Sequence, residues 1–151
     1  MSDRFGIETM AGITVTKKRN TAKAVTPAEA SRAHSRLEIL PTPNQPDLTK
    51  ADRFIESPWP VTDLPAVKPE LWDTAVNETI NLTELTGTDR YLKRDKVAEH
   101  INAISKTATP FKSYALVAEL DGSMIIIDGH HRLMAAWLLG QETAPVWKVE
   151  L

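Results

Sequence analysis

The residue types best suited to chemistry stand together at residues 128–132, in the order Asp-Gly-His-His-Arg. The apolar residues 124–127 before them predict a buried strand, and the small and apolar residues after them predict a helix. A glycine between strand and helix permits a sharp turn, and the start of a helix presents unpaired N–H groups and the positive end of its dipole. Because such a turn attracts anions, we expect a phosphate or carboxylate group to bind there.

Four of these residues are predicted to bind the anion: Gly129, His130, His131 and Arg132. Arg132 can make a bidentate, charge-assisted contact from the first helical turn. Each histidine can act as a donor, a base or a metal ligand near neutral pH. Adjacent helical side chains point ~100° apart, so we expect one histidine to line the pocket, the other to pack or cap, and no metal site. Asp128 is as good a candidate for helix cap as for catalytic group, and His130 is a second catalytic candidate.

The elements that must position this turn follow from periodicity and turn residues. Asp121-Gly122 between the apolar runs 113–119 and 124–128 predicts a hairpin. A helix is predicted over residues 131–139, because Gly140 suits the left-handed position after a helix. Residues 144–149 predict a final strand.

The residues before the hairpin predict one more strand and one more helix. Residues 79–83 alternate like a strand, and Asp95 can cap the helix that follows it. The order from residue 78 to 151 is therefore β-α-β-β-α-β, an α+β (α/β) domain with a small mixed sheet and packed helices. The side chains expected in its core are Val97, Ile101, Ile104, Leu133 and Trp137, whereas His100 is expected to face solvent.

Residues 1–77 predict an N-terminal arm with one short helix, over residues 28–40, that Thr26 can cap. Seven of the ten prolines lie within residues 41–70 and predict an extended connector. This connector carries apolar side chains, including Trp59 and Trp72, that gain little from water. We expect residues 1–75 to contact a protein partner or a second copy of the chain, and a chain lacking residues 1–60 to stay folded. The alternative is that both tryptophans pack back onto the domain.

Composition excludes several classes of function. The chain has no cysteine, which excludes disulfides, thiolate metal sites and a cysteine nucleophile. No apolar run approaches the ~18 residues of a membrane span, and no secretory signal is visible. The net charge of -2 argues against strong DNA binding. A cytoplasmic protein is expected.

The turn at residues 128–132 and the helix after it resemble the ParB/sulfiredoxin superfamily. Its members carry Gly-Cys-His-Arg in sulfiredoxins, Gly-Glu-Arg-Arg in chromosome-partitioning ParB proteins and Asp-Gly-His-Thr-Arg in free serine kinases. Gly129 and Arg132 match all three forms, and Asp128 and His130 match the kinase form. The resemblance extends to residues 81–85, the helix after Asp95 and the hairpin, about half of the chain.

The resemblance implies that the turn holds the phosphates of a nucleotide, with Mg²⁺ as the accompanying cation. The kinases also use a carboxylate base on another segment, for which Glu84 is the nearest candidate. His130 occupies the sulfiredoxin cysteine position, which excludes sulfinic acid reduction. The chain ends at Leu151 without a helix-turn-helix, so DNA partitioning is not expected.

The form of the turn is most similar to ParB-like domains encoded by bacteriophages, some of them attached to head-morphogenesis proteins. We therefore expect a phage-type protein that binds a nucleotide or another phosphate ligand at residues 128–132, in the host cytoplasm or in the virion. The alternative is a virion or head-assembly structural protein that keeps the fold as a packing module. A nuclease and a small-molecule kinase rank below both.

Overall fold

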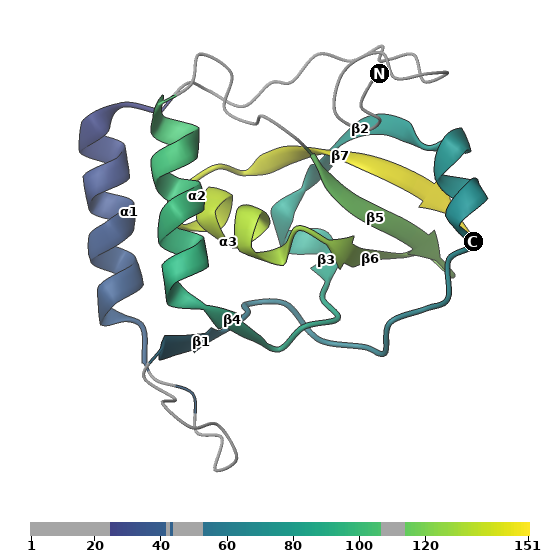
Figure 1. Cartoon of the computed structure of the whole chain (residues 1–151), viewed down its shortest axis with the longest axis horizontal. Helices are drawn as coiled ribbons and strands as arrows, with labels where there is room; N and C mark the ends of the chain where they lie inside the picture. Colours follow the sequence, from purple (N-terminus) through teal and green to yellow (C-terminus); the bar gives the residue numbers. More distant parts are fainter. Residues whose placement is uncertain (1–24, 42, 44–52, 107–113) are drawn as a thin grey trace.

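Five strands form one mixed sheet in the order β2-β7-β5-β6-β3, and two further strands, β1 and β4, pair beside it (Figure 1). This computed structural model describes residues 25–41, 43, 53–106 and 114–151, so predictions about residues 1–24 lie outside it. The elements run α1 (Pro27–Ile39), β1 (Phe54–Glu56), η2 (Pro69–Thr74), β2 (Val76–Asn81), η3 (Leu82–Glu84), β3 (Leu85–Thr86), β4 (Tyr91–Lys93), α2 (Arg94–Lys106), β5 (Ala115–Leu120), β6 (Ser123–Asp128), α3 (His130–Leu138) and β7 (Thr143–Glu150). The predicted α+β class with a small mixed sheet is confirmed.

The hairpin that leads to the site forms as predicted. β5 and β6 pair antiparallel, and the turn residues Asp121 and Gly122 have φ of 51° and 83°. Two consecutive left-handed residues match the right-handed twist of paired strands, which is why Asp-Gly suits this position. β7 then lies parallel to β5 and antiparallel to the edge strand β2, so β7 stands between β2 and β5 in the sheet.

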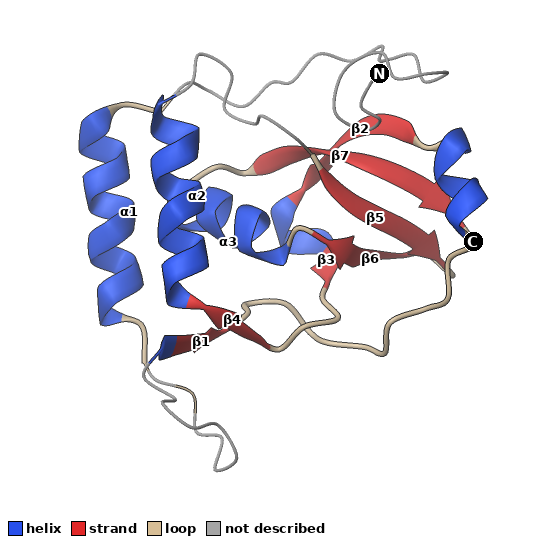
Figure 2. Ribbon diagram, viewed as in Figure 1, coloured by secondary structure: helices blue, strands red, loops and turns tan. Residues whose placement is uncertain are grey.

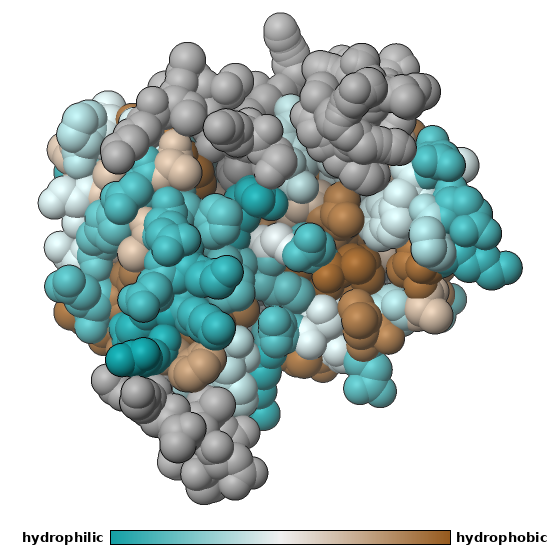
Figure 3. All heavy atoms as spheres, viewed as in Figure 1, coloured by the Kyte–Doolittle hydropathy of each residue, from teal (hydrophilic) through white to brown (hydrophobic). Residues whose placement is uncertain are grey.

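The helices lie together, with α1 beside α2 and α3 beside the sheet (Figure 2). The i, i+4, i+7 residues of α2 are buried as predicted: Val97, Ile101 and Ile104. Hydrophilic side chains cover α2 on the face shown in Figure 3, as expected of a helix whose apolar side faces the core. Among the described helices, none combines the length and the apolar character that crossing a membrane requires.

Trp137 was predicted to lie in the core, and that prediction is wrong. The side chain is 37% exposed on α3. Its ring stands edge-on to Trp59, with 6.2 Å between the ring centroids. Trp59, from the connector, is 4% exposed and belongs to the main hydrophobic cluster, a contact that helical periodicity alone does not reveal.

The described part of the predicted arm belongs to the domain. β1 pairs with β4, Ile55 is fully buried, and Trp59 is only 4% exposed. The indole N–H of Trp59 donates to the backbone carbonyl of Leu82 at 2.7 Å. Leu37 of α1 is buried in the same hydrophobic cluster. This differs from the expected arm that leaves its apolar side chains free, and the physical reason is that a small sheet with two helices has too little core without them.

The second tryptophan of the connector also packs on the domain. Trp72, in η2, contacts a smaller cluster on the opposite face of the sheet, formed by Ala75, Ala118, Trp147 and Val149. η2 precedes β2 directly, so this packing fixes where the edge strand begins. For Trp59 and Trp72 the alternative expectation, packing back onto the domain, is the one that the structure shows.

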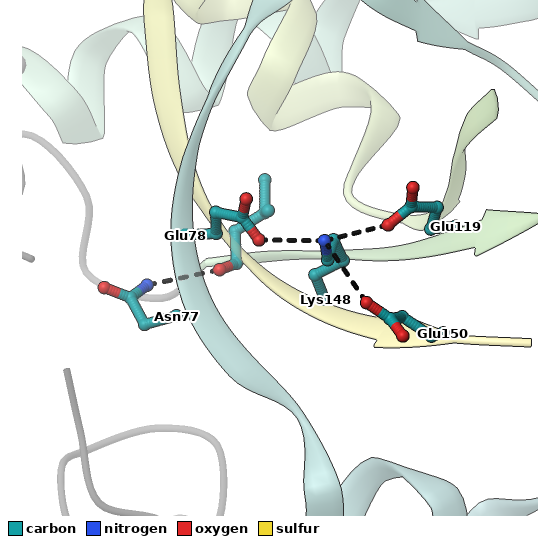
Figure 4. Close-up of polar contacts among 6 residues, drawn as sticks. Asn77, Glu78, Glu119, Lys148 and Glu150 are labelled. Atoms are coloured by element: carbon teal, nitrogen blue, oxygen red, sulfur yellow. Dashed lines mark hydrogen bonds and ion pairs between the residues drawn. The ribbon is translucent and has the colours of Figure 1, made fainter. Parts of the chain in front are cut away.

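A buried lysine links the three strands β2, β5 and β7 (Figure 4). Lys148 is 8% exposed, and its Nζ lies 3.0 Å from Glu78 Oε1 and 2.9 Å from Glu119 Oε1. Burial lowers the pKa of Lys148, but the hydrogen bonds that it donates to Glu119 and Glu78, together with the charges of these carboxylates, outweigh burial, so the net direction is upward. The ammonium group therefore stays charged and its donors are used within the sheet, which makes this cluster a cross-strand link rather than a ligand site.

Candidate functional site

The turn between β6 and α3 depends on Gly129. Its φ is 103°, and a Cβ built there would lie 2.7 Å from the Cβ of Ala115 on β5. An L side chain would be strained in that conformation and would also clash, so only glycine brings the start of α3 this close to the sheet. Gly129 is the N-cap residue and provides no side-chain hydrogen bond, so no side-chain cap covers the first amides of α3 in the described structure. Of the two roles considered for Asp128, helix cap and catalytic group, the helix cap is therefore not the one that the structure shows.

A pocket of about 500 Å³ opens at this turn. Its walls come from the β6–α3 turn, from the loop after β3, from one side of α2 and from the connector. The lining residues are Asp128, Gly129, His130, His131, Arg132, Thr88, Asp89, Lys96, His100, Leu64 and Ile127. All five residues of the predicted turn thus line one pocket.

Arg132 is the cation at the centre of the predicted site. Its side chain is half-buried, and no described residue forms a hydrogen bond or ion pair with its guanidinium group. Burial lowers the pKa of Arg132, and the nearby carboxylate of Asp128 partly opposes that shift. A guanidinium group nevertheless stays protonated in proteins. The pocket therefore contains a partly desolvated positive charge whose donors are not used by any residue that the structure describes.

His130 is buried and fixes a neighbouring loop. Its Nε2 accepts hydrogen bonds from the backbone N–H groups of Thr88, at 2.9 Å, and Asp89, at 3.2 Å. A ring nitrogen that accepts carries no proton, so the imidazole is neutral with its proton on Nδ1. Burial lowers the pKa of His130, reinforced by His131 and opposed by the carboxylates of Asp89 and Asp128. Its Nε2 is thus engaged by the protein rather than offered to a phosphate group.

His131 holds a different segment. Its Nε2 accepts a hydrogen bond from the backbone N–H of Lys93, at the end of β4, at 3.1 Å. Burial lowers the pKa of His131, while the carboxylate of Asp89 raises it. The two rings diverge as expected of helix neighbours, but both hold backbone amides. The expectation that only one histidine would pack against the protein is wrong, because both do.

Four polar pocket residues were missed as site residues by sequence reasoning: Thr88, Asp89, Lys96 and His100. His100 was expected to be solvated but is half-buried, and burial, followed by the positive charges of Arg132 and His131, lowers its pKa. Lys96 and His100 lie four residues apart and share one side of α2. Lys96 and His100 each precede a residue of the buried side, Val97 and Ile101. This spacing was the signal by which the sequence could have placed both of them on one side of the helix. Nothing in the sequence pattern indicated Asp89.

The candidate base Glu84 is not brought to the site. It is exposed in η3 and does not line the pocket. The carboxylates that do line it are Asp89 and Asp128. Among the described residues there is no group of three or more side chains able to hold a metal ion. Two carboxylates are nevertheless a donor set of the kind that Mg²⁺ uses together with the oxygens of a bound phosphate.

The ParB/sulfiredoxin resemblance of residues 78–151 stays a prediction. Comparison of the chain with protein-family models, with curated proteins and with solved structures found no match.

Proposed function

We propose that the pocket at residues 128–132 binds a phosphate group, carried by a nucleotide or by another phosphate ester. The observation that carries the proposal is the half-buried guanidinium group of Arg132, which no described residue contacts by a hydrogen bond or ion pair. Burying a charge without a partner is unfavourable, so such a group is expected where a ligand of opposite charge completes it. It stands in the first turn of α3, whose amides and dipole favour the same ligand.

The charges around the pocket favour a phosphate that arrives with a cation. Lys96 and Arg132 attract an anion, whereas Asp89 and Asp128 repel one. Mg²⁺ held by the two carboxylates would reverse that repulsion and neutralise the phosphate oxygens. A nucleotide with Mg²⁺ therefore fits this set of residues better than a bare anion does. The apolar Leu64 and Ile127 at the same pocket offer contacts for the uncharged part of such a ligand.

The family proposal agrees with this site. A ParB/sulfiredoxin-like domain of a phage-type protein, in the host cytoplasm or the virion, would place phosphates at this turn. An assembly role through residues 1–75 stays a prediction, and Ile55 and Trp59, two of the side chains that suggested it, are already buried in the domain. Turnover as a kinase or nuclease would require a base other than Glu84, for which Asp89 and Asp128 are the pocket carboxylates.

The test is calorimetric titration of the full chain with inorganic phosphate, pyrophosphate and nucleoside triphosphates, each with and without Mg²⁺. Arg132→Gln removes the charge and keeps a polar but shorter side chain. Loss of one charge-assisted contact is worth ~1.5–3 kcal/mol, which is about a ten- to hundredfold weaker affinity. We expect that loss for the best ligand, and a smaller one as salt increases, because salt screens the remaining charges.

Arg32→Gln is the matched control, since Arg32 is an exposed arginine on α1 outside the pocket. It is expected to bind like the parent chain. If Arg132→Gln and Arg32→Gln bind equally well, the ligand lies elsewhere. If none of the phosphate compounds binds the parent chain, the proposed function is wrong.

A further inference from the structure

The strand β2 forms one edge of the five-stranded sheet, and no described residue pairs with its outer side. Its six residues pair with β7 in one continuous antiparallel register. The opposite edge of the sheet differs, because β3 has only two residues and the connector residue Val61 forms a bridge with Gly87 directly after it. One edge of the sheet is therefore long and open, whereas the other is short and partly covered.

A proline on β7 determines which backbone groups of β2 face outward. Pro145 lies opposite Thr79 and has no N–H, so these two residues cannot exchange the pair of hydrogen bonds that alternate pairs of an antiparallel ladder exchange. The N–H of Leu82 donates to the carbonyl of Glu142 at 3.0 Å, which continues the same register beyond the end of β2. Both observations direct the backbone groups of the even-numbered residues of β2 toward β7.

The odd-numbered residues of β2 consequently direct their backbone N–H and C=O groups away from the sheet. These residues are Asn77, Thr79 and Asn81. Their outward backbone groups have no hydrogen-bond partner in the part of the chain that the structure describes. A row of unpaired N–H and C=O groups of this kind is a template for a further strand.

β2 lacks the features that usually prevent such pairing. Natural edge strands are often protected by lysine, by proline or by a bulge. β2 contains neither residue type, and its register with β7 has no shift. Its single charged residue, Glu78, has its Oε1 3.0 Å from Nζ of Lys148 and is thus paired within the sheet (Figure 4). The edge is therefore suited to accept a second strand.

We propose that two copies of the chain associate through β2, in an antiparallel pair whose twofold axis passes between the two Thr79 residues. Only a register that opposes odd-numbered residues lets the outward groups of both strands bond to each other. In the proposed register Asn77 lies opposite Asn81 of the second copy, and Glu78 lies opposite Ile80. A shift that opposes Asn77 to Thr79 would place Glu78 directly opposite its own copy, where like charges are destabilising. The opposite shift leaves only residues 79–81 paired.

The side chains of β2 also complement those of a second copy in this register. Oδ1 of Asn81 accepts from the N–H and the hydroxyl of Thr83, which leaves the NH2 group of Asn81 as a donor. Nδ2 of Asn77 donates to the carbonyl of Val146, which leaves Oδ1 of Asn77 as an acceptor. Asn81 of each copy can then donate to Asn77 of the other, on both sides of a central Thr79 pair. This self-complementarity favours a second copy over an unrelated strand.

Association through β2 ends at two copies, because the β3 edge is partly covered and the described sheet has no further open edge. Two short strands bury less than the ~1,200–2,000 Å² of a stable interface, so we expect a reversible dimer with a Kd of about 10–100 μM. β2 does not line the pocket, and the dimer does not rest on the proposed function. A dimer that binds no phosphate would remove the proposed function alone, and a monomer that binds phosphate would remove the dimer alone.

Sedimentation velocity of the full chain from about 1 μM to about 500 μM spans the expected Kd, and amide hydrogen exchange over the same range locates the interface. The amides of Asn77, Thr79 and Asn81 should gain protection by about four- to tenfold, the inverse of the monomer fraction at the highest concentration. The amides of Glu78 and Ile80 face β7 and should be protected at every concentration. This alternation distinguishes the β2 edge from any other interface.

Charge variants at the twofold axis provide the matched test. Thr79→Lys and Thr79→Asp each oppose two like charges, and each alone should weaken the dimer by at least about tenfold. An equimolar mixture of the two should associate again, because lysine then faces aspartate, and this recovery also shows that both variants are folded. Thr62→Lys is the control, since Thr62 is exposed in the connector and should dimerise like the parent chain.

The proposal is overturned if the parent chain stays monomeric over the whole range, or if the amides of Asn77, Thr79 and Asn81 stay unprotected in a dimer. It is also overturned if folded Thr79→Lys and Thr79→Asp each associate as well as the parent chain. Should either variant not fold, the exchange pattern of the parent chain alone decides.

Discussion

Gly129→Ala is expected to lower the free energy of unfolding by about 2–5 kcal/mol. The left-handed conformation alone costs an L residue ~1–2 kcal/mol. The added methyl group would also lie 2.7 Å from the Cβ and 3.0 Å from the Cα of Ala115, and forced overpacking of this kind costs ~1–3 kcal/mol. Chemical denaturation of the parent and variant chains measures the difference.

Gly122→Ala separates the two causes. Gly122 has φ of 83°, but a Cβ there would meet nothing within 4 Å, so only the backbone strain of ~1–2 kcal/mol applies. Gly129→Ala should therefore be the more destabilising of the two variants. Equal effects would show that α3 does not approach β5 as closely as described.

Trp59→Ala is expected to destabilise the fold by about 3–5 kcal/mol, the range for removing a large buried aromatic side chain. Trp59 is 4% exposed and its N–H is the donor to the carbonyl of Leu82. The variant leaves a cavity between residues 53–64 and the core. It also removes the hydrogen bond between this segment and Leu82 in η3.

Leu64→Ala is the control within the same segment, because Leu64 is 62% exposed. Surface substitutions of this kind change stability by less than ~0.5 kcal/mol. If Trp59→Ala changes the free energy of unfolding as little as Leu64→Ala does, residues 53–64 are not part of the core. The original expectation of an independent arm would then hold. The structure predicts instead that deleting residues 1–60 removes core side chains and unfolds the domain.

The elements set by local patterns could be predicted from the sequence. The hairpin follows from Asp121-Gly122, because two left-handed positions are needed there and Asp-Gly accepts them. The buried side of α2 follows from Val97, Ile101 and Ile104, because helical spacing puts them on one side. In both cases the deciding interactions lie within a few residues.

Packing between distant segments could not be predicted in the same way. Trp59 and Trp137 are 78 positions apart, and only their contact decides which ring is buried and which is exposed. The described residues 54–68 of the connector form no helix, as the prolines indicated, but an extended chain can lie on its own domain as well as on a partner. Residues 53–64 lie on their own domain, where β1 pairs with β4 and Trp59 is buried.

The candidate site likewise combines features that local patterns predict with contacts between distant segments that they do not predict. The strand-glycine-helix turn indicated the position of the pocket, because its chemistry is local to residues 128–132. The roles of the histidines depend on amides of Thr88, Asp89 and Lys93, which the sequence does not place near α3. Asp89 reaches the pocket through the loop after β3, a strand of two residues with no detectable pattern.

The central claim is that a phosphate group binds at the start of α3 through Arg132. An NMR titration of the isotope-labelled full chain with inorganic phosphate, and then with a nucleoside triphosphate and Mg²⁺, tests it most directly. The account predicts saturable shifts of the backbone amides of His130, His131 and Arg132, which Arg132→Gln abolishes and Arg32→Gln retains. Saturable shifts confined to other parts of the chain, or none at the highest phosphate concentration used, would contradict it.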